Sequence, residues 1–215
     1  MPTKTSSTIR CAILGGTFDP VHVGHLRVAI QLREAGFDRV LMMPNKTPPH
    51  RPQPMASSEQ RLQMLALATQ DLEGVEVCSV ELERDELSYS VVTLELLKAA
   101  HPNHIFTWVL GDDAWSGFDR WHRCDDLFEL ANLLIIHRPG EKTDEPEWQA
   151  NQLQNRQTSL QELLSCAKGA ISRESWPGLD VSASALRNAI SKGKNIRFLV
   201  PDAVFQHLQQ QPLYR

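Results

Sequence analysis

The chain has 215 residues, 22% of them charged, and a formal net charge of −4. This length suits one well-packed domain and is short for two, so we expect residues 1–215 to form a single domain with a flexible tail at 1–8. The absence of a long apolar run or a signal peptide argues against a membrane protein. The acidic balance argues against a nucleic-acid-binding protein.

The four cysteines, at positions 11, 78, 124 and 166, lie far apart and show no C-x-x-C spacing. Such spacing favours reduced thiols over a zinc site or a disulfide framework. We therefore expect a cytoplasmic protein, present as a monomer or a weak homo-oligomer.

Apolar strand-like runs alternate with amphipathic segments along the chain. The predicted strands are 9–14, 39–44, 75–80, 105–110, 133–137 and a short piece at 170–172. Helices are predicted from His22 or Gly24 to Ala35, from Ser57 or Ser58 to about Gln70, from a cap at Ser90 to residue 100, at 124–130, from a cap at Ser182 to Gly193, and from about Pro201. Alternation of this kind predicts an α/β fold with a parallel sheet and helices on both faces.

Residues 141–168 stand apart as a polar, Gln-rich insertion, which we expect to be an exposed helix or loop. The other polar motifs follow predicted strands, at 15–25, 44–51, 111–113 and 138–140. Because ligands of such sheets bind at the carboxyl ends of the strands, these motifs are expected to meet in one site.

The stretch 15–25 reads GGTFDPVHVGH. Gly15 and Gly16, followed by Thr17 and Phe18, let backbone amides approach a ligand, and the helix that follows offers its N-terminus to an anion. His22 and His25 share one face of that helix. Gly24 between them leaves room for a nucleotide. A metal site would need further ligands, and none has suitable spacing.

The H-x-G-H pattern resembles the signature of the Rossmann-like nucleotidyltransferase superfamily, and the longer stretch resembles the bacterial nicotinate mononucleotide adenylyltransferases. A second family signature, I-S-S-T-x-I-R, corresponds to Val181–Arg187, with Ala183 and Ser184 as departures. The resemblance implies a doubly wound parallel sheet and the joining of ATP to nicotinate mononucleotide, with release of pyrophosphate, in NAD biosynthesis.

The resemblance also implies roles for individual residues. His22 and His25 would be the catalytic pair that holds the ATP phosphates, protonated once ATP is bound. The implied ATP-binding residues are Gly15, Gly16, Thr17, Phe18, Gly24, Gly111, Asp113, Ser182, Ser184 and Arg187. The implied substrate-binding residues are Asn45, Lys46, His50, Arg51, Ser90, Trp121, His122 and Arg138, with Trp121 stacked on the pyridine ring. Mg²⁺ would be carried by the ATP phosphates, with no metal ligand from the protein.

Taken alone, several of these stretches have plainer interpretations. Residues 180–190 could be an ordinary capped surface helix, and the loop at 44–51 an exposed basic loop. Two other functions stay open: a pantetheine-phosphate adenylyltransferase, and a catalytically silent nucleotide-binding protein. The choice of nicotinate over nicotinamide mononucleotide rests on the resemblance.

Overall fold

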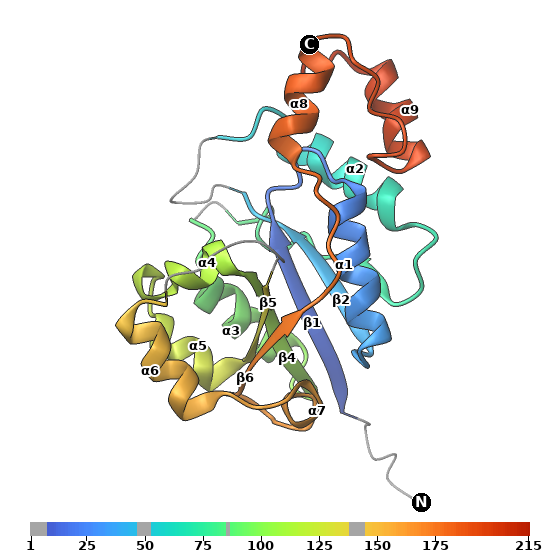
Figure 1. Cartoon of the computed structure of the whole chain (residues 1–215). Helices are drawn as coiled ribbons and strands as arrows, with labels where there is room; N and C mark the ends of the chain where they lie inside the picture. Colours follow the sequence, from blue (N-terminus) through green and yellow to red (C-terminus); the bar gives the residue numbers. More distant parts are fainter. Residues whose placement is uncertain (1–7, 47–52, 85–86, 138–144) are drawn as a thin grey trace, which may run out of the picture.

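The computed structural model describes residues 8–46, 53–84, 87–137 and 145–215 (Figure 1). The predictions for His50, Arg51 and Arg138, and for most of the tail at 1–8, lie outside these residues.

Six parallel strands form one sheet in the order β3-β2-β1-β4-β5-β6. The strands are β1 (Ile9–Gly16), β2 (Arg39–Pro44), β3 (Val75–Val77), β4 (His104–Gly111), β5 (Asn132–His137) and β6 (Ile171–Ser175). The chain therefore winds outward from β1 to β3, returns to the other side of β1 with β4, and continues to β6. This order confirms the predicted doubly wound sheet, and its direction reverses between β1 and β4.

Helices cover both faces because alternate strand residues are apolar on each side. On one face, side chains such as Ala12 and Met42 pack against helices α1 (Val23–Glu34), α2 (Ser58–Thr69), α7 (Leu160–Leu163), α8 (Ala183–Ser191) and α9 (Asp202–Gln210). On the other face, side chains such as Ile13 and Phe106 pack against α3 (Ser90–Ala100), α4 (Asp112–Ser116), the 3-10 helix η1 (Phe118–Arg120), α5 (Cys124–Leu130) and α6 (Glu147–Arg156). No helix within the described ranges is both long and apolar enough to cross a membrane.

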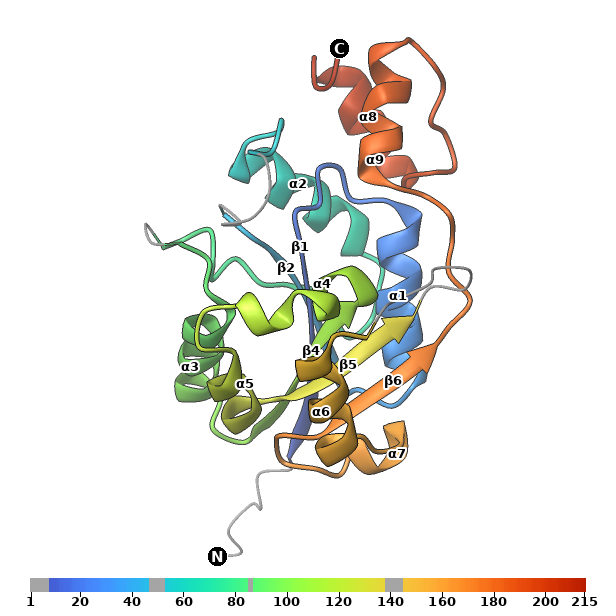
Figure 2. The same cartoon turned by 60° about the vertical axis from the view of Figure 1, so that its left-hand side comes forward.

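The last two helices sit beside the end of the sheet where β1 passes into α1. Figures 1 and 2 both show α8 and α9 together there, next to α2. Contacts between α2 and α9 fix this arrangement. The C-terminal part of the chain is thereby brought to the carboxyl ends of the strands.

Several details differ from the prediction. The cap of α3 is Tyr89, with extended backbone and no capping side-chain hydrogen bond, so the prediction of Ser90 as the cap was wrong by one residue. The strand predicted at 75–80 ends at Val77, because β3 is a short edge strand that pairs only with β2. Helices α4 and η1 were not predicted.

The segment 145–168 is less exposed than its composition suggests. Within it, α6 buries Gln149 completely and Leu153 almost completely, and Leu163 of α7 is fully buried. The helix was expected, but one face of it belongs to the packed interior.

Candidate active site

The centre of the site is the turn that joins β1 to α1, beside the end of β4. Gly15 near the end of β1 and Gly111 at the end of β4 are both exposed. A Cβ atom added at Gly111 would meet nothing within 4 Å, and one at Gly15 would meet only the Trp108 ring, at 3.7 Å. The sheet is thus open where its winding reverses, which is the expected place for a ligand.

The two histidines lie together at the N-terminus of α1. His22 is the N-cap residue of the helix, in extended conformation and 5% exposed. The rings of His22 and His25 are stacked with centroids 3.7 Å apart, and the Phe18 ring meets His25 edge-on at 4.9 Å. The sequence-based prediction that both imidazoles share one face is confirmed.

A backbone hydrogen bond determines which nitrogen of His25 carries its proton. The amide of His22 donates to His25 Nδ1 at 3.3 Å. An Nδ1 atom that accepts a hydrogen bond carries no proton, so the proton of the neutral ring lies on Nε2. In its neutral form His25 would therefore donate through Nε2, and the expected imidazolium in the presence of ATP stays a prediction.

The two glycines that flank the histidines make room for rings of the protein itself. A Cβ at Gly24 would lie 3.0 Å from His22 Nδ1, and a Cβ at Gly16 would lie 3.0 Å from the Phe18 ring. The nearest neighbour of Gly24 is thus the His22 imidazole, and the prediction that this glycine leaves room for a nucleotide stays a prediction.

The amides at the start of α1 are partly engaged. Val23 N–H donates to the carbonyl of Leu199 at 3.0 Å, and His25 N–H donates to the carbonyl of His22 at 3.0 Å. The expected anion site at this helix therefore depends more on the two imidazoles than on open backbone amides.

Helix α8 brings a guanidinium to the same turn. Ser182 caps the helix as predicted, because its hydroxyl accepts a hydrogen bond from the amide of Ala185 at 3.2 Å. Arg187 donates to the carbonyl of Asp19 at 2.6 Å and lies near the hydroxyl of Ser184, at 3.4 Å. The two separate sequence motifs thus meet in space.

Comparison with known proteins agrees with this geometry. The cytidylyltransferase-like family model matches residues 13–189. A Pseudomonas putida protein named "Probable nicotinate-nucleotide adenylyltransferase" is 40% identical over 99% of this chain and 93% of its own length. A protein of the same name from Aeromonas hydrophila is 40% identical over 94% of this chain and 96% of its own. The chain belongs to the nicotinate-nucleotide adenylyltransferase family.

A solved structure shares the fold of this adenylyltransferase. The Plasmodium falciparum nicotinic acid mononucleotide adenylyltransferase complexed with NaAD superimposes with a TM-score of 0.73, covering 96% of this chain and 97% of its own, at 17% identity. The same Plasmodium enzyme complexed with APC gives a TM-score of 0.70.

Several residues that family resemblance assigns to the mononucleotide come from elements around α3. Ser90 is the first residue of that helix. The ring of Tyr89 lies 4.3 Å from that of His122, which ties the start of α3 to the segment after η1. Trp121 packs on Phe118, with ring centroids 5.0 Å apart.

A row of aromatic contacts connects this substrate region to the histidine turn. Trp121 meets Trp108 of β4 edge-on at 6.4 Å, and Trp108 in turn lies below Gly15. Trp121 is half-buried while His122 is exposed. Trp108 therefore contacts Trp121 on one side and lies close to Gly15 on the other.

Of the remaining predicted residues, Asp113 is exposed, whereas Lys46 makes hydrogen bonds within the protein. Asp113 is exposed just after β4, whereas its neighbour Asp112 is buried and pairs with His137 Nδ1 at 3.0 Å. Lys46 donates to the carbonyl of Arg84, and its amide donates to the Ser88 hydroxyl at 3.2 Å. Lys46 therefore contacts both Arg84 and Ser88.

Sequence reasoning missed a set of buried groups beneath the histidine turn. Arg61 of α2 is 1% exposed and donates to the carbonyls of Thr17 and Asn45, at 2.9 and 2.8 Å. Asp19, 3% exposed, accepts a hydrogen bond from Tyr214 near the C-terminus at 2.6 Å. No local pattern links residues so far apart in the chain.

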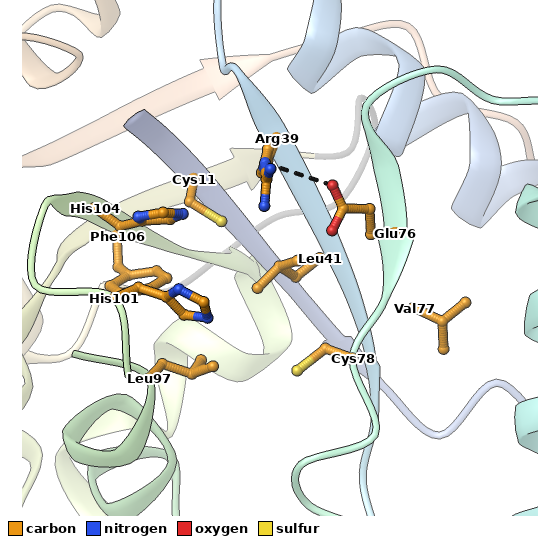
Figure 3. Close-up of a pocket in the computed structure, with 10 residues that line it drawn as sticks. All are labelled: Cys11, Arg39, Leu41, Glu76, Val77, Cys78, Leu97, His101, His104 and Phe106. Carbon is orange, nitrogen blue, oxygen red and sulfur yellow. Dashed lines mark ion pairs between the residues drawn. The ribbon is translucent and has the colours of Figure 1, made fainter. Parts of the chain in front are cut away.

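A separate hollow of about 210 Å³ lies toward the amino ends of the strands, away from the histidine turn. Figure 3 shows His101, His104 and Cys78 around it, beside the Arg39–Glu76 ion pair at 3.5 Å. Its volume is below that of an ordinary small-molecule site. Across the described ranges, no group of three or more His, Cys, Asp or Glu is arranged to hold a metal ion.

Proposed function

We propose that this chain transfers AMP from ATP to nicotinate mononucleotide, giving nicotinate adenine dinucleotide and pyrophosphate, in the biosynthesis of NAD. The observation that carries the proposal is the stacked His22–His25 pair at the start of α1, beside the opening between β1 and β4. Relatives of that function match almost the whole chain at 40% identity.

The reaction requires that the two phosphates be held in line and that the negative charge on the leaving pyrophosphate be compensated. A phosphate oxygen of the mononucleotide forms a bond to the α-phosphorus of ATP, and the bond from that phosphorus to the bridging oxygen breaks. The electron pair leaves with pyrophosphate. Because the attacking phosphate is already ionised at pH 7, no general base is required.

The described residues supply donors for the charge that develops. We assign the ATP phosphates to His22 and His25, with Nε2–H as the donor of His25. Arg187 and Ser184 of α8 lie beside the same turn and would hold the other phosphates. Mg²⁺ enters as part of the ATP substrate, bound to its phosphates.

The second substrate would lie across the opening. Trp121 would stack on the pyridine ring, and the backbone amides of Ser90 and His122 would receive the carboxylate. Asp113 would hold a ribose hydroxyl. The assignments of His50, Arg51 and Arg138 to phosphate groups remain sequence-based, as does a monomer or weak homo-oligomer. The four free cysteines support a cytoplasmic location.

Release of pyrophosphate from ATP, measured with a panel of acceptors, separates the candidate functions. Turnover with nicotinate mononucleotide supports the proposal. Turnover only with a pantetheine phosphate would assign the chain to that other adenylyltransferase, and ATP binding without turnover would identify a silent nucleotide-binding protein. The ratio of kcat/KM for nicotinate over nicotinamide mononucleotide, expected to exceed one, tests the substrate preference.

His25→Ala removes one donor to the ATP phosphates, together with the Nδ1 acceptor of the His22 amide. We expect kcat to fall about 100-fold, the scale of one lost oxyanion donor. His101→Ala, at the hollow remote from the turn, is the matched control and should keep the parent kcat. A His25→Ala enzyme with kcat within threefold of the parent would contradict the assignment.

A further inference from the structure

The buried carboxylate of Asp19 connects three distant parts of the chain. Its Oδ2 accepts the amide of Met55 at 2.8 Å, and its Oδ1 accepts the amide of Ala56 at 3.1 Å. Oδ1 also accepts the hydroxyl of Tyr214 at 2.6 Å. Arg187 Nη1 lies 3.7 Å from Oδ2. The turn that leads to the catalytic histidines is thereby tied to the start of α2, to α8 and to the C-terminal segment.

The charges of this cluster do not cancel. Asp19 contributes one negative charge, whereas Arg61 and Arg187 contribute two positive charges. Burial lowers the pKa of Arg61, and the nearby Asp19 carboxylate opposes that shift. Burial and the hydrogen bond to Asp19 raise the pKa of Tyr214, so its hydroxyl stays a neutral donor. The two guanidinium groups therefore outnumber the Asp19 carboxylate, while the exposed Glu59 also acts on Arg61.

Arg187 is hydrogen-bonded to the backbone carbonyl of Asp19 and forms only a long ion pair with its carboxylate. Its guanidinium donates to the backbone carbonyl of Asp19 at 2.6 Å, while 3.7 Å to Oδ2 is too long for a hydrogen bond. The two carboxylate oxygens already accept three hydrogen bonds, one of them from Tyr214. The Arg187 side chain keeps 27% of its surface exposed and stays beside Ser184.

We propose that Tyr214 is a positioning residue for the ATP phosphates, which rests on the proposed function of Arg187. The hydroxyl of Tyr214 donates a hydrogen bond to the Asp19 carboxylate. This carboxylate is then less able to pull Arg187 into a shorter, hydrogen-bonded ion pair. The Arg187 guanidinium then stays available to bind the triphosphate of ATP. The C-terminal segment, more than 180 residues after the histidine turn, thus becomes part of the machinery that binds ATP.

Tyr214→Phe tests this inference because it removes only the hydroxyl. We expect Asp19 to pull Arg187 inward and KM for ATP to rise about tenfold, the scale of one charge-assisted hydrogen bond. KM for the mononucleotide should change less than about twofold. The matched control is Thr69→Val, which removes another buried hydroxyl, one that donates to the carbonyl of Leu65 within α2. A general loss of packing would raise both KM values together and would overturn the proposal.

A double-mutant cycle decides whether Tyr214 acts through Arg187. In an Arg187→Ala background, adding Tyr214→Phe should change KM for ATP by less than about twofold. An equal rise in both backgrounds would show that Tyr214 acts independently, contrary to the proposal.

Calorimetric binding of ATP with Mg²⁺ gives a measurement that needs no turnover. A tenfold weaker Kd for Tyr214→Phe supports the positioning role, and an unchanged Kd overturns it. If the parent chain binds ATP but forms no dinucleotide, the proposed reaction fails while this result still stands.

Discussion

Gly24, between the two stacked histidines, lies close against the His22 ring. A Cβ at Gly24 would come within 3.1 Å of two atoms of the His22 ring, a distance tighter than ordinary van der Waals contact. Gly24 lies inside α1, where glycine weakens a helix relative to alanine. Glycine at this position therefore lowers the stability of the first turn of α1, but it leaves room for the His22 ring to stack on His25.

Gly24→Ala should separate stability from activity. Alanine gains up to about 1 kcal/mol of helix propensity at this position, whereas its methyl group displaces the His22 ring. We expect an unchanged or higher Tm together with a kcat lowered at least tenfold. Thermal unfolding and steady-state kinetics on the same preparation check both parts. A variant that keeps the parent kcat would show that the ring has room to move.

At the scale of elements, α6 supports the segment that carries Trp121. Gln149 is fully buried, and its Nε2 lies within hydrogen-bond distance of the carbonyls of Trp115 and Ser116 and of Asp119 Oδ1, at 3.2, 3.0 and 2.9 Å. The buried carbonyls of α4 would otherwise lack this donor. Helix α6, from a polar, Gln-rich segment, thus holds the residues that precede Trp121 in place.

Gln149→Leu conserves most of the volume and removes the donor. Leaving buried carbonyls unsatisfied costs about 1–3 kcal/mol, so the free energy of unfolding should fall by that amount. Because Trp121 and His122 follow the braced segment, KM for the mononucleotide should rise several-fold while KM for ATP is retained. Gln154→Leu, on the exposed face of α6, is the control. Equal effects on both KM values would show that α6 does not act on the substrate side selectively.

The elements differ in how far the sequence alone could predict them. Three features were predicted because residues close together in the sequence determine them: the long apolar strands, the turn before α1 and the cap at Ser182. Helices α4 and η1 have five and three residues, too few for a periodic pattern. Gln149 and Tyr214 act through contacts with remote segments, so their burial becomes visible only in the folded chain.

At the scale of the whole molecule, the net charge of −4 coexists with a positive site. Arg61 and Arg187 bring positive charge to the histidine turn, and some acidic side chains elsewhere are paired with cations, as in the Lys168–Glu129 and Arg123–Asp126 pairs. The acidic total is therefore compatible with the proposed binding of ATP phosphates, because local charge governs the interaction at close range.

The buried Tyr214 makes folding stability depend on alkaline pH. Its pKa is raised in the folded chain, whereas an unfolded tyrosine ionises near pH 10. Above about pH 10 the unfolded state therefore releases a proton that the folded state retains, and stability falls by at most about 1.4 kcal/mol per pH unit. Tyr214→Phe lacks this contribution. Denaturant unfolding should show that the free energy of unfolding of the parent exceeds that of Tyr214→Phe by less at pH 11 than at pH 8. The same difference at both pH values would contradict a raised pKa for Tyr214 in the folded chain.

The order of strands also governs when the molecule can fold during its synthesis. β1 leaves the ribosome first, and β2 can pair with one of its edges soon afterwards. Its other edge must wait for β4, because Ile9 pairs with His104 and Leu14 with Val109. About half of the chain is therefore translated before β1, an inner strand of the sheet, has both partners. A nascent chain released before residue 111 would present an unpaired apolar strand edge, the kind of surface that chaperones bind.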